Sequence, residues 1–247
     1  MKAKICIGVL ILISFSLPIF AQSGEELLAE ADALFMEMKD METAQKVLAT
    51  CRKAVGMMET NYEPFWRIAR IMYYIGIHTE KKKEKKTIFS QGVYYAGKAI
   101  DIEPEKPDAH YWLAVDNGKV GETRGVLKSL SLVKPIKKAL NKVIELDRAY
   151  EDGGADMVMG RVYFKLPGIA GGSKEKSLEH LLKAMEYGPN NVTLRFYLAE
   201  TYLKMKKKDE AKAHLEFILN LEDDPLWIDS VMIYKAEADA LMKKKFK

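Results

Sequence analysis

The sequence has little of what identifies several common classes of protein. Its 247 residues include only two cysteines, Cys6 and Cys51, and the first lies in an apolar leader, so no internal disulfide is expected. Acidic and basic residues nearly balance, with a net charge of +4 that falls to +2 without Lys2 and Lys4. Because nucleic-acid-binding proteins usually carry a strongly basic face, this balance argues against a nucleic-acid partner. Runs of alternating apolar and polar residues, which would predict β-strands, are almost absent.

The first 21 residues have the pattern of a secretory signal peptide. Lys2 and Lys4 precede an apolar run from Ile5 to Phe20, and Ala21 offers a small residue at the cleavage point. The run is shorter than the roughly 20 apolar residues of a membrane span. The pattern predicts an exported protein, periplasmic in a Gram-negative bacterium and otherwise secreted, with residues 22–247 as a single mature domain. Retention of the leader as an anchor is the alternative, and no membrane contact is expected beyond it.

What the sequence does contain is helical periodicity. Apolar residues recur at i, i+3, i+4 and i+7, as in Leu194, Leu198 and Tyr202. Glycine and proline interrupt this pattern at nearly regular distances, which is typical of helical repeats.

The tetratricopeptide (TPR) pattern accounts for these repeats. It describes a helical hairpin with small residues where the two helices approach and large residues between hairpins. Residues 192–225 match it without adjustment, with Ala199 and Tyr202 in the first helix and Ala211 in the second. We therefore predict an all-α, TPR-like helical-hairpin solenoid of about five repeats with a C-terminal capping helix. The predicted repeats cover residues 25–58, 63–106, 107–150, 153–191 and 192–225, and the cap covers residues 226–247.

No constellation typical of an enzyme or a metal site is present. The four histidines lie in separate predicted helices without the H-E-x-x-H spacing, so we expect no catalytic residue, no metal and no cofactor. The glycine-rich stretch from Pro167 to Gly172 lacks the spacing of a phosphate-binding loop and is interpreted as an interhelical loop, with Ser173 as the N-cap of the next helix. Cys51 stands where TPR hairpins place a small packing residue, which predicts a buried and inert thiol.

The remaining candidate site is a groove on the concave side of the solenoid. In TPR hairpins this wall is built mainly by residues of the first helices. Aromatic side chains beside a few charges would bind an apolar ligand with an anionic end, with Arg161 as the partner of the anion. The alternative is that several of these side chains pack against inserted loops. The predicted groove residues are Arg67, Tyr74, Tyr111, Lys119, Arg161, Phe164, Phe196 and Glu200.

The stretch from His110 to Asn191 carries a more specific resemblance. It contains Gly160-Arg161 and a Pro167-to-Gly172 insertion before a TPR second helix. It resembles the T component of tripartite ATP-independent periplasmic (TRAP) transporters and, more distantly, is similar to the regulator of microtubule dynamics proteins. The resemblance implies a periplasmic repeat protein that associates with the transporter's substrate-binding subunit and handles an apolar small molecule. Many T components carry a lipidated cysteine, which this chain lacks.

Together these observations predict a non-catalytic, exported binding protein with a protein partner and an apolar or amphipathic small ligand. The alternative is a structural adaptor in envelope assembly that binds peptides through the same groove. Retention of an apolar molecule through purification would favour the first function, and a peptide-sized partner would favour the second. Association of identical copies into a homo-oligomer is left open.

Overall fold

All regular structure in the described part of the chain is helical. The computed structural model describes residues 22–125, 127–222 and 231–246, and none of their helices is long and apolar enough to cross a membrane. The predicted all-α, TPR-like solenoid is confirmed. The predicted signal peptide, residues 1–21, lies outside the described residues, as do the first residues of the predicted cap. The α-helices in chain order are α1 (Gly24–Met36), α2 (Met41–Met57), α3 (Glu63–His78), α4 (Lys82–Ile102), α5 (Pro107–Arg124), α6 (Leu130–Leu146), α7 (Tyr150–Lys165), α8 (Lys174–Met185), α9 (Val192–Lys204), α10 (Lys208–Leu219) and α11 (Val231–Lys245).

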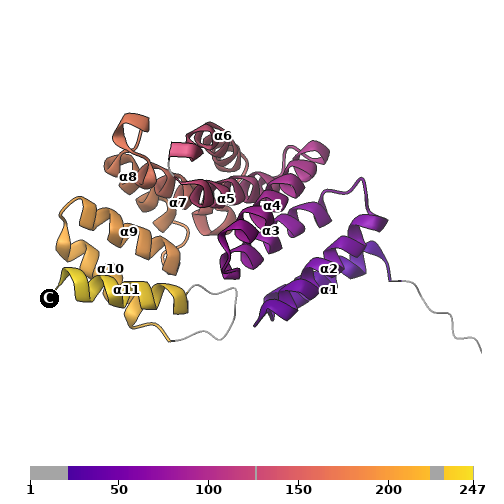
Figure 1. Ribbon diagram of the computed structural model, residues 1–247, viewed down its shortest axis with the longest axis horizontal. Coiled ribbons are helices and arrows are strands. Elements are labelled where there is room, and N and C mark those ends of the chain that lie inside the picture. The colour runs from indigo at the N-terminus through magenta and orange to yellow at the C-terminus, as the bar shows by residue number, and fades with distance from the viewer. Residues whose placement is uncertain (1–21, 126, 223–230, 247) are drawn as a thin grey trace, which may run out of the picture.

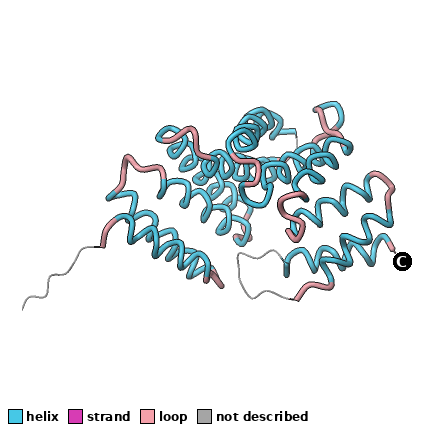
Figure 2. Tube along the Cα trace, turned by 180° about the vertical axis from the view of Figure 1, so that it is seen from behind, coloured by secondary structure: helices cyan, strands magenta, loops and turns pink. Residues whose placement is uncertain are grey.

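Consecutive helices pair into hairpins, and the hairpins stack side by side into an arch (Figures 1 and 2). The hairpins are α1–α2, α3–α4, α5–α6, α7–α8 and α9–α10, and α7 begins at Tyr150, before the predicted start of the fourth repeat at residue 153. Helices α6 and α8 lie on the outer side of the arch, whereas α5 and α7 lie nearer its inside (Figure 1). Helix α11 packs against α9 and α10 at the C-terminal end.

Polar caps explain where several helices begin. The Ser23 hydroxyl accepts a hydrogen bond from the Glu26 amide at 3.2 Å, and the Glu26 carboxylate accepts one from the Ser23 amide. Asp40 and Asn191 cap α2 and α9 in the same way. The predicted cap at Ser173 is confirmed, because its hydroxyl accepts a hydrogen bond from the Lys176 amide at 3.1 Å.

Small residues sit where helices cross, as the repeat pattern requires. Ala69, Ala96 and Ala114 are completely buried in the largest core cluster, which joins the second hairpin to the third. Cys51 is also completely buried, and its burial raises the pKa of the thiol to about 11. A thiol with that pKa stays protonated near neutral pH, which fits its predicted packing role.

The start of α7 has an unusual backbone that brings it close to α5. Glu151, Asp152 and Gly153 all have positive φ values, of 51°, 55° and 76°. Gly154 follows, and a Cβ atom there would lie 2.7 Å from a ring carbon of Tyr111 on α5. The glycine therefore permits a close approach between the two inner helices, and this approach shapes the cavity described next.

Candidate functional site

A cavity of about 860 Å³ opens on the inner side of the arch. Its walls come from the first helices of four hairpins, α3, α5, α7 and α9, together with parts of α6 and α11. Cavities of this size hold small ligands in many proteins. Residues that are distant in sequence, from Tyr73 on α3 to Glu237 on α11, thus line one space.

One wall of the cavity is a continuous aromatic cluster. The ring centroids of Tyr73 and Tyr74 lie 5.1 Å apart, and those of Tyr73 and Trp112 lie 5.6 Å apart. The Tyr111 ring contacts the Trp112 ring edge to face at 5.1 Å. Most of these contacts have the edge-to-face or tilted geometry that aromatic pairs prefer. The cluster offers a rigid, mainly apolar surface with hydroxyl groups at its edges.

Cationic side chains gather near α7. The Arg161 guanidinium forms an ion pair with Glu200 and lies 4.1 Å from the centroid of the Tyr197 ring. The Lys119 ammonium group lies 3.1 Å from the Glu122 carboxylate. Lys165 also lines the cavity, and it makes no ion pair with any carboxylate in the described part of the chain.

Burial and like charge both act on the cations of this region. Burial lowers the pKa of Lys165, and the nearby charge of Arg161 lowers it further, because each positive charge is less well solvated and repels the other. The Arg161 Nε is buried and has no hydrogen-bond partner among the described residues. Around Arg161, the cations Lys119 and Lys165 join it beside the carboxylates of Glu122 and Glu200, and the buried Arg161 Nε has no acceptor among the described residues. Glu151 and Glu237 also line the cavity.

Four of the predicted groove residues line this cavity: Tyr74, Tyr111, Lys119 and Arg161. Glu200 is joined to it through its ion pair with Arg161. The Phe164 ring does not line the cavity, but lies beside it, 5.2 Å from the Arg161 guanidinium and 4.4 Å from the Lys204 ammonium group.

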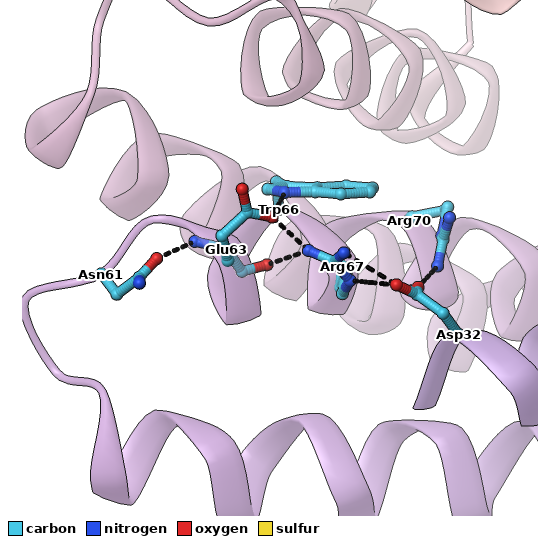
Figure 3. A network of polar contacts seen from close by, with 6 residues as sticks. All are labelled: Asp32, Asn61, Glu63, Trp66, Arg67 and Arg70. Carbon is cyan, nitrogen blue, oxygen red and sulfur yellow. Dashed lines mark hydrogen bonds and ion pairs between the residues drawn. The ribbon is translucent and has the colours of Figure 1, made fainter. Parts of the chain in front are cut away.

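Two predicted groove residues lie elsewhere. Phe196 is only 5% exposed and packs 5.0 Å from the Tyr234 ring, because α11 covers that side of α9. Arg67 belongs to a polar network between α1 and α3, in which its Nη2 donates to Asp32 at 2.7 Å (Figure 3). Arg67 also forms an ion pair with Glu63 on its own helix. Phe196 and Arg67 therefore make contacts that stabilise the fold and do not face the cavity.

Sequence reasoning missed several cavity residues that contribute hydroxyl, ammonium or carboxylate groups. Tyr73 and Tyr197 each lie next in sequence to a residue of the predicted groove. A repeat register shifted by one residue would have included them. Tyr234 and Glu237 come from α11, which was interpreted only as a cap. Lys165 lies at the end of α7, near Arg161, and no repeat pattern marks it.

Within the described residues, no group of three or more histidine, cysteine, aspartate or glutamate side chains is arranged to hold a metal ion. The histidines serve other contacts. The His180 Nδ1 lies 2.7 Å from the buried Asp156 carboxylate, which also accepts a hydrogen bond from Arg148. The His214 ring stacks on Tyr202 at 5.7 Å.

Residues 27–167 match the model of the family described as regulator of microtubule dynamics protein 1–3. The chain belongs to this family. It is 27% identical to mouse regulator of microtubule dynamics protein 1 over 203 residues, which are 74% of this chain and 63% of the mouse protein. It is 26% identical to rat regulator of microtubule dynamics protein 3 over 63% of this chain, but over only 36% of that longer protein.

Solved structures show the same fold at low sequence identity. A thermophilic TPR protein of Thermus thermophilus superposes with a TM-score of 0.65 over 88% of this chain and 100% of that chain, at 15% identity. Pseudomonas aeruginosa PilF superposes with a TM-score of 0.56 over 90% of this chain and 92% of its own, at 11% identity. These neighbours share the TPR-like fold of this chain.

The prediction of export is wrong. The relatives are mammalian proteins named as regulators of microtubule dynamics, and microtubules are polymers of the cytoplasm rather than of the periplasm or the extracellular medium. The more distant of the two resemblances is therefore the one that the family supports, and no T component is among these relatives. A role as an accessory of a periplasmic transporter depended on export and falls with it.

Proposed function

We propose that this member of the family is a non-catalytic binding protein whose inner cavity holds a molecule with an apolar body and an anionic end. The observation that carries the proposal is the combination, in one cavity of about 860 Å³, of the aromatic wall with the cationic region around Arg161. Either feature alone is common on helical repeats. Side by side they match both ends of an amphipathic ligand.

Each end of the ligand has a physical reason to bind. The apolar body would cover the half-buried rings of Tyr73 and Tyr74, and each Å² of apolar surface removed from water contributes about 25 cal/mol. The anionic end would accept hydrogen bonds from Arg161, whose Nε has no acceptor among the described residues, and would sit beside Lys165. Hydrogen bonds to charged groups are the stronger ones, especially away from bulk water.

A protein partner completes the proposal. TPR-like arches bind proteins, and the names of the relatives make a protein of the microtubule system the candidate partner of this chain. The matched stretch spans 63% of mouse protein 1 and 36% of rat protein 3, so the activity of those whole proteins comes to this chain only as part of the proposal.

A pair of matched fluorescent probes tests the ligand class. Anilinonaphthalene sulfonate carries an anionic group, whereas N-phenylnaphthylamine has a similar ring system without the charge. The Arg161→Gln variant should bind the anionic probe about tenfold more weakly, which corresponds to about 1.4 kcal/mol. Glu200→Gln should bind it more tightly, because the guanidinium loses its competing carboxylate. Both variants should bind the neutral probe like the wild type.

Native mass spectrometry of the purified protein, followed by organic extraction, identifies the natural occupant. A bound apolar anion that denaturation releases would support the proposal. A protein that binds both probes equally in all variants, or that retains an acidic peptide instead, would overturn it in favour of a peptide-binding adaptor.

A further inference from the structure

The outer face of the arch carries a second surface, distinct from the inner cavity. From Gly125 to Ile144 the chain contains five lysines and no acidic residue. Helix α6, which holds four of these lysines, lies on the outer side of the arch near the loop between α7 and α8 (Figure 1). Lys134, Lys138 and Ala170 line one shallow groove on that side, which places the α7–α8 loop beside α6.

Three apolar side chains on this surface are exposed to solvent. Ile169 is 101% exposed at the tip of the α7–α8 loop, Leu127 in the short 3₁₀ helix before α6 is 77% exposed, and Leu130 at the start of α6 is 37% exposed. Leu130 lines the groove, whereas Ile169 and Leu127 do not. The side chains of Ile169 and Leu127 therefore protrude into solvent instead of facing the groove.

The backbone holds both protruding side chains in place. The α7–α8 loop is closed by hydrogen bonds from the Ala170 and Gly172 amides to the Pro167 carbonyl, at 2.9 and 3.0 Å. A Cβ atom at Gly172 would lie 2.0 Å from the Leu166 carbonyl oxygen, so only glycine permits this closure. The segment that carries Leu127 is tied to α5 by the Ser129 hydroxyl, which lies 2.6 Å from the Gly121 carbonyl oxygen.

The lysines around these side chains have few carboxylate partners. Lys142 forms ion pairs with Glu105 and Glu145. In contrast, Lys134 and Lys138 are exposed and make no ion pair with any described residue, and the Lys137 ammonium group lies over the Tyr163 ring at 3.7 Å. The net charge of the surface is therefore positive.

We propose that this surface, defined by Leu127, Leu130, Lys134, Lys138 and Ile169, docks onto an anionic lipid bilayer. Protruding aliphatic side chains can enter the acyl region of a bilayer, whereas a protein partner would need a pocket for each of them. The lysines beside them would contact anionic headgroups, and each lysine near such a membrane strengthens binding by about fivefold. The inference stands apart from the proposed function, because it uses a different face of the arch.

A fluorescent label at the loop tip tests the proposal in the full chain. The environment-sensitive dye NBD is attached to an Ile169→Cys variant in which Cys6 is replaced by serine; Cys51 is buried and does not compete for the dye. Vesicles of phosphatidylcholine and phosphatidylserine should shift the emission to the blue, and vesicles of phosphatidylcholine alone should not. A label on the Met57→Cys variant, 58% exposed on α2, is the control and should not respond.

Charge variants separate this surface from other routes to the membrane. In the labelled background, Lys134→Gln with Lys138→Gln should raise the lipid concentration for half-maximal shift at least tenfold. Lys208→Gln with Lys212→Gln on α10 should leave it unchanged. The proposal is overturned if the label at residue 169 does not respond to the vesicles, or if the labels at residues 169 and 57 respond alike. It is also overturned if a polyglutamate peptide gives the same shift as the vesicles, since the surface would then bind acidic polypeptides.

Discussion

At the scale of single residues, burial of Asp116 on α5 carries a cost in stability. Asp116 is completely buried, and neither of its carboxylate oxygens has a hydrogen-bond partner in the described part of the chain. The carboxyl group fills the space of a missing side chain at Gly92 on α4, where a Cβ atom would lie 2.0 Å from Oδ2. Burial raises the pKa of Asp116 well above its usual range, and Lys119 offsets this only in part. In the folded protein, Asp116 therefore stays protonated to higher pH than an exposed aspartate.

The Asp116→Asn variant tests this. In the unfolded chain an aspartate ionises near pH 3.9, whereas in the folded chain Asp116 stays protonated to higher pH, so its contribution to stability is lost as the pH rises above about 4. The variant should lose this dependence of stability on pH. At pH 7 its free energy of unfolding should exceed that of the wild type by about 1–3 kcal/mol, so it should unfold at a higher urea concentration. Circular dichroism at several pH values measures it. The exposed Asp101→Asn is the control, and an unchanged pH profile in Asp116→Asn would contradict the assignment.

The residue scale is also where sequence reasoning about the site reached its limit. Four residues of the predicted groove, Tyr74, Tyr111, Lys119 and Arg161, line one cavity. The repeat register could not show that α11 would cover Phe196 and leave its neighbour Tyr197 in the wall, because that depends on contacts between elements distant in sequence.

Arg67 illustrates the same limit from the opposite end of the chain. Its position on the first helix of a repeat predicted a groove residue. Nothing in the local sequence indicates that Asp32, on the preceding hairpin, lies opposite its guanidinium.

At the scale of elements, the end of α9 offers a clean test of helix capping. Lys206 has a φ of 64°, and its amide donates to Leu203, while the Lys207 amide donates to Tyr202. These two bonds form a Schellman motif, in which the left-handed position favours glycine. Lysine at that position carries a steric cost that glycine would not.

The Lys206→Gly variant should therefore be more stable by about 0.5–1 kcal/mol, since it relieves the left-handed strain at some cost in unfolded-chain entropy. The control, Ala213→Gly, lies exposed inside α10 and should destabilise by about 1 kcal/mol. Thermal unfolding distinguishes the two. A loss of stability in both variants would show that the strain at Lys206 is negligible.

The elements themselves were the most predictable part of the molecule. Helical periodicity and regular breaks are local properties, so they can be read from single stretches such as the one around Leu198 and Tyr202. The backbone at Glu151 and Asp152 could not be predicted in this way, because neither residue favours positive φ and the turn depends on packing around Gly153 and Gly154.

At the scale of the whole molecule, the polar network in Figure 3 joins the first hairpin to the second. Asp32 on α1 accepts hydrogen bonds from Arg67 and Arg70 on α3, and the Arg70 guanidinium stacks 3.8 Å from the centre of the Phe35 ring. Burial alone would raise the pKa of Asp32, but the two arginines lower it below its usual value. This contribution to stability is present above about pH 4 and is lost as the pH falls through the lowered pKa.

Loss of the network should release the first hairpin. In a repeat array each hairpin is held mainly by its neighbour, so Asp32→Ala should increase hydrogen exchange in α1 and α2 while α5 to α8 stay protected. Mass spectrometry of exchanged peptides measures this at pH 7. The control is Glu42→Ala, which removes an exposed ion pair with Lys46 on α2 and should leave exchange unchanged. Uniform loss of protection along the chain would argue against a local role.

The span of the cavity along the chain has a consequence for folding. Each hairpin can form with contacts to its neighbours, so helix content develops from short-range interactions that close quickly. The cavity, in contrast, needs Tyr73 on α3 and Tyr234 on α11 in place at once. We therefore expect the cavity to assemble last, so that a chain with nearly native circular dichroism can still lack it. Ligand uptake, rather than helix content, is the measure of a fully folded arch.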